Sequence, residues 1–392
     1  MASPPKAERL HAASCADAVK VLTILGTRPE IIRLSRVIEK LDTACQHVLV
    51  HTGQNYAESL SDVFFDELRV REPDAYLNVR EATFGAQIGA IITRCEQVLE
   101  AERPDRLLIL GDTNSGLAAI PAKRLGIPVF HMEAGNRCYD DRVPEEVNRR
   151  IIDHSSDVLM PYTERSRANL LREGFASERV FVIGNPIFEV LNYYGEDIER
   201  SDVLDRLNLS PRGYFLASLH REENVDVPSR LNDFITALGK LGREHNLSVV
   251  CSTHPRTRNR LERAGLSVGD LLLSEPFGFF DFIALERNAY CVLSDSGTVQ
   301  EECCIFGIPN VTLRDVTERP ETVEAGSNML TGSDPGSILR AVRAVVDGAT
   351  NWRVPSEYQV PNVSTTVVKI VLGHLELPAT AKRAVPDKAE AI

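Results

Sequence analysis

Long apolar runs are missing from this sequence, and their absence excludes membrane-spanning proteins. No hydrophobic stretch approaches the roughly 18 residues that a bilayer-spanning helix needs. The start, Met1 to Ala18, is interrupted by prolines and charges and lacks the apolar centre of a signal peptide. We therefore expect no contact with a membrane and a cytoplasmic location.

Paired cysteines and an excess of basic residues are also missing. The eight cysteines are scattered without a C-x-x-C pair, so the sequence predicts reduced thiols and no metal site. Lys and Arg number 44 against 56 Asp and Glu, which gives a net charge of −12. Such an acidic chain is not expected to bind nucleic acid, which requires a basic surface.

Two glycine-rich phosphate loops are absent as well. Neither G-x-G-x-x-G nor G-x-x-x-x-G-K-[ST] follows the first strand of either half. The sequence therefore indicates neither a nicotinamide cofactor nor a nucleoside triphosphate, and we expect no cofactor.

What is present is an α/β pattern over most of the 392 residues, enough for about two or three domains. Short β-branched runs alternate with amphipathic stretches, which is typical of βαβ units in parallel sheets. The predicted strands are Val19 to Leu25, His47 to His51, Arg106 to Leu110, Pro128 to Met132, Val158 to Tyr162, Val180 to Ile183, Tyr214 to Ser218, Leu247 to Ser252, Leu271 to Ser274, Ala289 to Ser294 and Asn310 to Leu313. The predicted helices include Glu30 to Leu41, Gly85 to Glu100, Glu145 to His154, Ser229 to Glu244 and Thr298 to Phe306.

This alternation predicts two doubly wound, Rossmann-type domains. A charged, turn-rich stretch at 192–213 marks the junction, so we expect domains at 19–190 and 191–364. A last apolar helix at 365–377 is expected to return to the first domain. The flanking segments 1–18 and 378–392 are expected to be flexible.

Polar side chains follow the predicted strands of the first half. Arg28 comes after the first strand, Gln54 after the second, Asp112 after the third and Glu133 after the fourth. Ligands of open α/β sheets collect at such strand ends. Singly, Asp112 is equally well explained as a turn or helix cap and Glu133 as a buried partner of Arg137, but together they favour a site.

The second half repeats this theme with residues suited to an anion. Ser296, Gly297 and Thr298 lie between a strand and a helix, where free N–H groups can bind a phosphate or diphosphate. Glu302, about one turn further on, is either a ribose contact or part of a solvated helix face. His220 follows the first strand of this half. The run His254-Pro255-Arg256-Thr257-Arg258 follows the next strand and supplies local positive charge. A noncatalytic nucleotide-sugar sensor remains an alternative to an enzyme.

Eight ordered motifs give the sequence a family resemblance. They are Gly26-Thr27-Arg28-Pro29-Glu30, Gly111-Asp112-Thr113, Glu133-Ala134-Gly135, Pro144-Glu145-Glu146-Val147-Asn148-Arg149, Gly184-Asn185-Pro186, His220-Arg221-Glu222, Ser294-Asp295-Ser296-Gly297 and Glu318-Arg319-Pro320-Glu321. From about residue 20 to 375 the chain resembles the non-hydrolysing UDP-N-acetylglucosamine 2-epimerases. The resemblance implies a GT-B-like α/β architecture, with two Rossmann-type domains facing a central cleft, and a homodimer.

The resemblance also implies roles for single residues. Asp112, Glu133, Glu145 and His220 occupy the positions of the family's catalytic groups. The positions that match its substrate contacts, or that we expect to complete the UDP-sugar site, are Arg28, Arg33, Gln54, Asn185, Arg221, His254, Phe282, Ser296, Gly297, Thr298, Glu302 and Arg319. Arg33 stands where the family usually has lysine, which keeps the positive charge but presents it on a planar fork.

The resemblance implies reversible 2-epimerisation of a UDP-N-acetylhexosamine, in the first place UDP-N-acetylglucosamine to UDP-N-acetylmannosamine. Several motif variants look closest to the branch that forms UDP-N-acetyl-L-fucosamine from a 6-deoxy sugar nucleotide, so the same chemistry on that sugar is an alternative. A hydrolysing epimerase and a GT-B glycosyltransferase also stay open, because fold alone does not fix function.

Chemistry favours elimination and readdition for such an inversion. The proton on carbon 2 is scarcely acidic until the anomeric C–O bond breaks, which releases UDP and leaves a 2-acetamidoglucal. We hypothesise that Asp112, Glu133 and Glu145 share the proton transfers at carbon 2. His220 and Arg28 would stabilise the departing diphosphate, and Ser296 would help to retain UDP.

Overall fold

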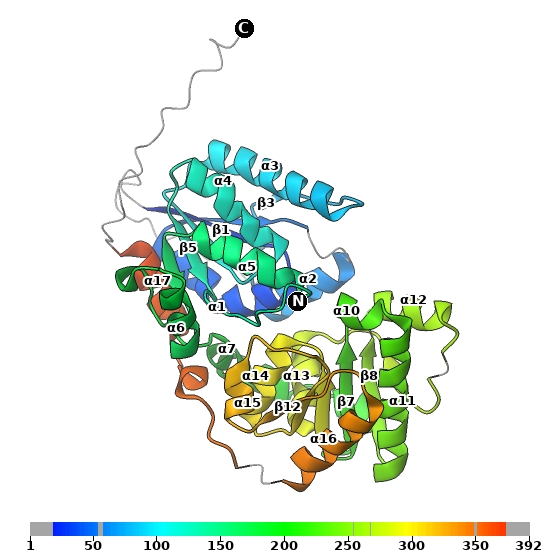
Figure 1. The fold of residues 1–392 in the computed structure, drawn as a ribbon. Helices are drawn as coiled ribbons and strands as arrows, with labels where there is room; N and C mark the ends of the chain where they lie inside the picture. Colours follow the sequence, from blue (N-terminus) through cyan, green and yellow to red (C-terminus); the bar gives the residue numbers. More distant parts are fainter. Residues whose placement is uncertain (1–18, 54–57, 254, 267, 349–350, 374–392) are drawn as a thin grey trace, which may run out of the picture.

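The computed structural model describes residues 19–53, 58–253, 255–266, 268–348 and 351–373. These residues form two lobes, each built around a six-stranded parallel sheet (Figure 1). The segments 1–18 and 378–392, together with Gln54 and His254, lie outside the described residues.

The first sheet has the order β3-β2-β1-β4-β5-β6. Its strands are β1 Lys20–Leu25, β2 Gln46–His51, β3 Ala75–Tyr76, β4 Arg106–Leu110, β5 Val129–Met132 and β6 Val158–Met160. β1 and β4 are neighbours although they are not consecutive, so the winding of the sheet reverses between them. Such a reversal opens a crevice at the carboxyl ends of the two strands.

The second sheet repeats this topology, with the order β12-β11-β10-β7-β8-β9. Its strands are β7 Tyr214–Leu219, β8 Ser248–Thr253, β9 Leu272–Ser274, β10 Cys291–Ser294, β11 Asn310–Thr312 and β12 Asn328–Leu330. Here the winding reverses between β7 and β10, which pair in parallel register. The prediction of two doubly wound parallel sheets is confirmed.

Helices cover both faces of the sheets (Figure 1). The α-helices are α1 Arg28–Ala44, α2 Glu58–Glu67, α3 Phe84–Glu102, α4 Ala119–Arg124, α5 Pro144–His154, α6 Glu164–Arg172, α7 Ile187–Tyr193, α8 Gly195–Glu199, α9 Val203–Arg206, α10 Glu222–Val225, α11 Pro228–His245, α12 Pro255–Arg263, α13 Phe279–Asn288, α14 Gly297–Phe306, α15 Pro320–Glu324, α16 Pro335–Asp347 and α17 Val363–Leu372. The 3₁₀ helices are η1 Asn114–Ala118, η2 Ser177–Arg179 and η3 Ser356–Gln359. None of the helices in the described ranges is long and apolar enough to cross a bilayer.

The last helix, α17, lies beside the first lobe although the second sheet precedes it in the chain (Figure 1). Val363, Val367 and Val371 bury one face of α17 in the core that also contains α1. The N-terminus of α17 is fixed because the Ser364 N–H donates to Glu189 of α7 at 2.8 Å. The helix begins two residues before the predicted start, and residues 374–377 of the prediction are not among those described.

The prediction of a strand at 180–183 is wrong. The segment makes only an isolated parallel bridge between Val180 and Leu159. Phe181 and Ile183 donate to Leu159 and Pro161 at 2.9 and 3.0 Å, but Pro161 has no N–H with which to complete the ladder. Two short edge strands, β3 and β12, were not predicted from the sequence.

Candidate active site

Candidate residues from both lobes lie at the two points where the sheets reverse their winding. In the first lobe, Arg28 follows β1 and Asp112 follows β4. In the second lobe, His220 follows β7 and Ser296 comes two residues after β10. The topology thus places the residues predicted from the sequence at the crevice of each sheet.

A cavity of about 170 Å³ joins the two lobes. Arg28 and Ile32 of α1 and Phe64 of α2 line it from the first lobe. Its second-lobe lining consists of Ser218, Leu219, His220, Ser252, Pro276, Phe277, Gly278, Phe279, Phe282, Ile283, Ser296, Thr298, Val299 and Glu302. Apolar rings beside a few polar groups are what a nucleotide base and its phosphates require.

The N-terminus of α14 forms one polar wall of this cavity. Ser296 is the N-cap residue, and its hydroxyl lies 3.0 Å from the hydroxyl of Thr298. Gly297 opens the helix, and a Cβ at this position would lie 2.8 Å from a carboxylate oxygen of Glu318. The unpaired N–H groups of the first turn and the two hydroxyls make this wall suitable for an anion.

His220 projects toward the cleft and is oriented by Asp295. Its Nδ1 lies 3.0 Å from Asp295, and its side chain is 49% exposed. Burial alone would raise the pKa of Asp295, but His220, Asn224 and Arg221 outweigh it and lower the pKa to about 2. An ionised Asp295 therefore favours the His220 tautomer with hydrogen on Nδ1.

Glu133 belongs to a ring of four buried charges drawn from both lobes. Arg33 of α1 contacts Glu133 and Glu301, and Arg319 contacts the same two carboxylates at 2.6 and 2.5 Å. Burial would raise the pKa of Glu133, but Arg319 and Arg33 lower it to about 2. Glu133 is therefore ionised and doubly paired, and it sits at a backbone φ of +66°.

Asp112 and Glu145 lie near this ring but have different partners. Arg149 reaches Asp112 through Nε at 3.1 Å and through a second, closer nitrogen. Within the part of the chain that the structure describes, the cationic partner of Glu145 is Arg221, at 3.4 Å. Burial raises the pKa of Glu145, and the charge of Asp112 raises it further against the opposing effect of Arg221. Of these carboxyl groups, Glu145 keeps its proton to a higher pH than an ordinary glutamate.

The remaining predicted contacts fall into three groups. Arg221 and Arg319 lie among the buried charges described above. Asn185 is fully buried at the start of α7, where it accepts a hydrogen bond from the Ile187 N–H at 3.0 Å, and it does not line the cavity. Gln54 and His254 are not described.

Four buried charged residues of the site were not predicted, namely Arg149, Asp295, Glu301 and Glu318. Glu318 is held by Arg314 at 2.8 Å and by Arg221 at 3.4 Å. All four lie inside or beside the motifs that carry the family resemblance, and this position in the sequence is what could have indicated them. Across the described ranges, no group of three or more His, Cys, Asp or Glu side chains is arranged to hold a metal ion.

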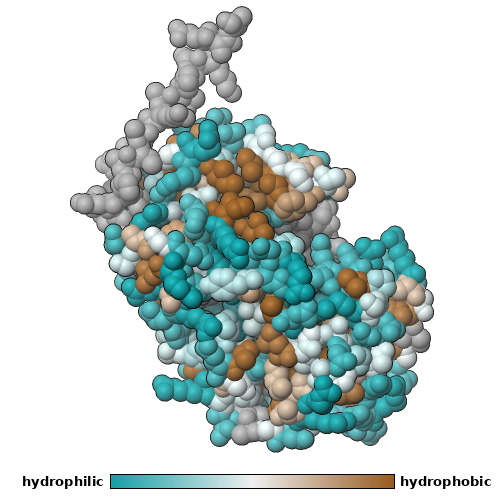
Figure 2. Space-filling view, in the orientation of Figure 1, coloured by the Kyte–Doolittle hydropathy of each residue, from teal (hydrophilic) through white to brown (hydrophobic). Residues whose placement is uncertain are grey.

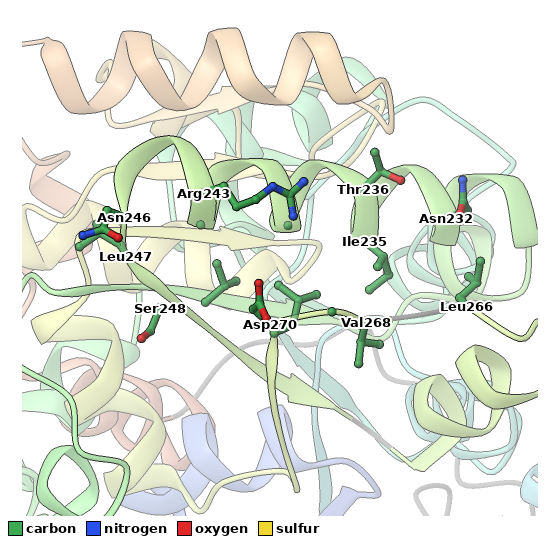
Figure 3. Close-up of a pocket in the computed structure, with 15 residues that line it drawn as sticks. Asn232, Ile235, Thr236, Arg243, Asn246, Leu247, Ser248, Leu266, Val268 and Asp270 are labelled. Atoms are coloured by element: carbon green, nitrogen blue, oxygen red, sulfur yellow. The ribbon is translucent and has the colours of Figure 1, made fainter.

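A larger hollow of about 740 Å³ lies elsewhere, along α11 and next to β8 (Figure 3). Arg243 of α11 and Asp270, in the loop before β9, line it. It contains none of the residues predicted for the site, so the size of a cavity does not locate the chemistry here.

A cleft between two Rossmann-type sheets, with an anion-binding helix terminus and clustered buried carboxylates, defines a class of two-lobed enzymes that act on sugar nucleotides. Comparison with known proteins agrees with this class. The family model described as UDP-N-acetylglucosamine 2-epimerase matches residues 39–372. The chain belongs to the UDP-N-acetylglucosamine 2-epimerase family.

Individual relatives match over nearly their whole length. The UDP-N-acetylglucosamine 2-epimerase of Methanococcus maripaludis is 38% identical over 364 residues, which is 90% of this chain and 98% of the relative. The solved structure of the Rickettsia bellii UDP-N-acetylglucosamine 2-epimerase is 44% identical with a TM-score of 0.85, covering 91% of this chain and 97% of that one. The Methanocaldococcus jannaschii UDP-GlcNAc 2-epimerase, solved in complex with UDP-GlcNAc and UDP, is 39% identical with a TM-score of 0.85, covering 90% and 99%.

A distant match bears on the fold alone. The structure of Phytolacca americana UGT2 has a TM-score of 0.55 at 12% identity, covering 90% of this chain and 99% of that one. This similarity confirms the GT-B-like architecture predicted from the sequence.

Proposed function

We propose that this protein interconverts UDP-N-acetylglucosamine and UDP-N-acetylmannosamine without net hydrolysis. The observation that carries this proposal is the full-length match to epimerases, one of them solved with UDP-GlcNAc and UDP, combined with a cavity that both lobes line. In this proposal the second lobe binds the nucleotide, and the carboxyl groups of the first lobe face the sugar.

We place the nucleotide in the cavity between the lobes. Phe282 packs beside the uracil, and Glu302 meets the ribose. Ser296 and Thr298 at the N-terminus of α14 bind the diphosphate, with Arg28 opposite them on α1. This arrangement leaves the sugar directed toward Asp112, Glu133 and Glu145.

The reaction then needs charge stabilisation at the diphosphate and proton transfer at carbon 2. The anomeric C–O bond breaks and its electron pair leaves with UDP, while carbon 2 loses its proton and a C1–C2 double bond forms. Arg28 and His220 stabilise the negative charge that grows on the leaving group. Readdition of UDP at carbon 1, with a proton delivered to the other face of carbon 2, regenerates the UDP linkage and inverts the centre.

The environments of the carboxyl groups suggest how the proton roles divide. Asp112 and Glu133 are paired with arginines and can accept a proton. Glu145 has a raised pKa and can donate one. We therefore propose Glu145 as the acid in the direction that forms UDP-N-acetylmannosamine, with the paired carboxylates on the opposite face.

A second candidate substrate is the 6-deoxy sugar nucleotide of the UDP-N-acetyl-L-fucosamine branch. The motifs from Arg28 to Arg36 and from Ser252 to Arg258 favour it. A relative that is 37% identical, from Pseudomonas aeruginosa, is a UDP-2,3-diacetamido-2,3-dideoxy-D-glucuronate 2-epimerase, so relatives of similar identity differ in their sugar. Parallel assays with both substrates and equal enzyme decide between them by kcat/KM.

The direct test is incubation with UDP-N-acetylglucosamine alone, followed by chromatography and NMR of the products. We expect UDP-N-acetylmannosamine with the UDP linkage intact. Free UDP together with N-acetylmannosamine would identify a hydrolysing epimerase. Unchanged substrate that reacts only after an acceptor is added would identify a glycosyltransferase.

We also propose that the protein works as a cytoplasmic homodimer of two-domain subunits, divided near residue 190. An apolar patch near α4 supports the dimer (Figure 2). Phe84 of α3 is 66% exposed, and Val147 and Ile151 of α5 are 45% and 40% exposed. Because Glu145 lies in the first turn of the helix that carries Val147 and Ile151, a partner subunit packed there would also hold the Glu145 carboxyl in position.

A further inference from the structure

Behind the nucleotide cavity lie two buried carboxyl groups, those of Glu286 and Glu302. Glu286 is fully buried and Glu302 is 4% exposed, and the two groups are within hydrogen-bonding reach of each other. Neither oxygen of Glu286 has a hydrogen-bond donor among the described residues. Burying an ionised carboxylate without a cation or a hydrogen-bond donor costs roughly several kcal/mol, so at least one of the two groups is expected to be protonated.

Both carboxyl groups lie on the same helix faces as residues that line the cavity. On α13, Glu286 lies four residues after Phe282 and three after Ile283, both of which line the cavity. On α14, Glu302 lies four residues after Thr298 and three after Val299, which line it as well. Residues at these spacings share one helix face. The two carboxyls therefore meet one turn beyond the lining residues, where α13 packs against α14.

The pair must hold one proton to be stable. Two ionised carboxylates would face each other with no donor between them, whereas one proton allows an O–H···O bond. Burial and the charge of Glu302 raise the pKa of Glu286 well above its ordinary value, and burial raises the pKa of Glu302 to about 7. Because Glu286 is the more deeply buried and the more strongly shifted, the proton resides on Glu286.

We propose that Glu286 is a positioning residue for nucleotide binding, whose carboxyl donates a shared proton to Glu302 and so fixes Glu302 as an acceptor for the two ribose hydroxyls. This inference rests on the proposed function, because it takes the cavity as the UDP site. Glu302, which lines the cavity, makes the contact, and Glu286 acts through it.

Other ionisable groups around the pair come from α1, α14 and β10. Arg33 of α1 opposes the raised pKa of Glu302, and the neighbouring Glu301 adds to it. The thiols of Cys303 and Cys291 lie close by, and burial raises the pKa of both. Arg33 is already paired with Glu133 and Glu301, so it does not take the place of the shared proton.

The test compares UDP with 2′-deoxy-UDP by titration calorimetry on the intact protein. We expect the unaltered protein to bind UDP roughly tenfold more tightly than 2′-deoxy-UDP, as a hydrogen bond to a charged group implies. Glu286→Leu should weaken UDP binding by roughly tenfold and bring the ratio near one. Glu286→Gln still donates to Glu302 and should keep the ratio. Arg287→Gln, on the neighbouring position of α13, is the matched control.

Each outcome bears on the proposal. An unchanged ratio in Glu286→Leu, or a ratio lost equally in Glu286→Gln, would overturn it. If Glu286→Leu does not fold, Glu286→Gln decides, because an amide proton is not lost as the pH rises. UDP affinity of the unaltered protein should decline as the pH rises through the raised pKa of Glu286, because the shared proton is then lost. This decline should be smaller in Glu286→Gln, and an identical decline would overturn the proposal. Failure of the unaltered protein to bind UDP would instead contradict the proposed function.

Discussion

At the scale of single residues, the same side chain has opposite properties at two places in the cleft. Glu133 is held ionised between Arg33 and Arg319, whereas burial and Asp112 raise the pKa of Glu145. Before substrate reacts, one cleft thus offers both an ionised carboxylate and a carboxyl that retains its proton to higher pH. This separation is what elimination and readdition require.

Replacing Glu133 by Gln tests the role of the ionised group. The amide cannot accept a proton and can accept from the two arginines at only one oxygen, so we expect kcat to fall by roughly a hundredfold or more. UDP affinity, measured by calorimetry, should remain nearly unchanged because Glu133 does not line the cavity. Glu164→Gln, an exposed change on α6, is the control. Normal turnover in Glu133→Gln would remove this residue from the catalytic set.

The pH dependence of Arg221→Gln tests Glu145 as the acid. An acid with a raised pKa loses activity as the pH rises through that pKa. The charge of Arg221 lowers the pKa of Glu145, so its removal should move the alkaline limb of the kcat profile to higher pH. Arg260→Gln, which breaks a partly exposed pair with Asp226, should leave the limb in place. A limb that stays fixed or moves to lower pH in Arg221→Gln would contradict the assignment.

The sequence predicts several residues of the candidate site, but not the residues with which they form ion pairs. Asp112, Glu133 and His220 follow predicted strands, so topology alone brings them to the sheet edges. Their partners depend on packing between distant segments: Arg33 meets Glu301, 268 positions away. No local pattern encodes such a pairing, and for this reason the low pKa of Glu133 was not predicted.

At the scale of elements, α2 of the first lobe caps α13 of the second. Glu67, the last residue of α2, accepts a hydrogen bond from the Phe279 N–H at 2.6 Å. Gly278 leaves room for this carboxylate, because a Cβ at that position would collide with it. α13 carries Phe282 and Glu286, so this cap from the first lobe helps to position the proposed nucleotide site.

Loss of this cap should therefore affect binding more than chemistry. In Glu67→Ala we expect the KM for the UDP-sugar to rise several-fold, consistent with a capping interaction of about 1 kcal/mol, while kcat changes little. Steady-state kinetics measure this split. Asp66→Ala, the exposed neighbour on α2, should behave as the unaltered protein. An unchanged KM in Glu67→Ala would show that the cap does not support the site.

Strands with a long hydrophobic run were predictable from the sequence, whereas very short strands were not. The central strands β1, β4, β7 and β10 are predominantly apolar, as expected for sheets buried on both faces. β3 has only two residues and β12 only three, too few to show a period. The segment 180–183 has strand composition, but its neighbour Pro161 cannot return a hydrogen bond.

At the scale of the whole molecule, buried ion pairs connect the two lobes. Arg33 and Glu133 come from the first lobe and Glu301 and Arg319 from the second, so the ring ties the sheets together at the site itself. The net charge of −12 does not prevent binding of an anionic nucleotide, because arginines and a helix N-terminus set the local field.

The exposed apolar residues of α5 test the proposed dimer interface. Ile151→Glu places a charge in the proposed interface. We expect the unaltered protein to run as a dimer and Ile151→Glu as a monomer, as measured by light scattering after size exclusion. Val323→Glu alters a similarly exposed residue of the second lobe and should leave the dimer intact. A dimer that persists in Ile151→Glu would place the interface elsewhere.

Incubation of the protein with UDP-N-acetylglucosamine in deuterated water tests the central claim most directly. Elimination and readdition remove the proton on carbon 2 and return one from solvent-exchanged carboxyl groups. We therefore predict deuterium at carbon 2 of UDP-N-acetylmannosamine, with the bond between sugar and UDP restored. Epimerised product that retains the original hydrogen at carbon 2 would contradict this mechanism.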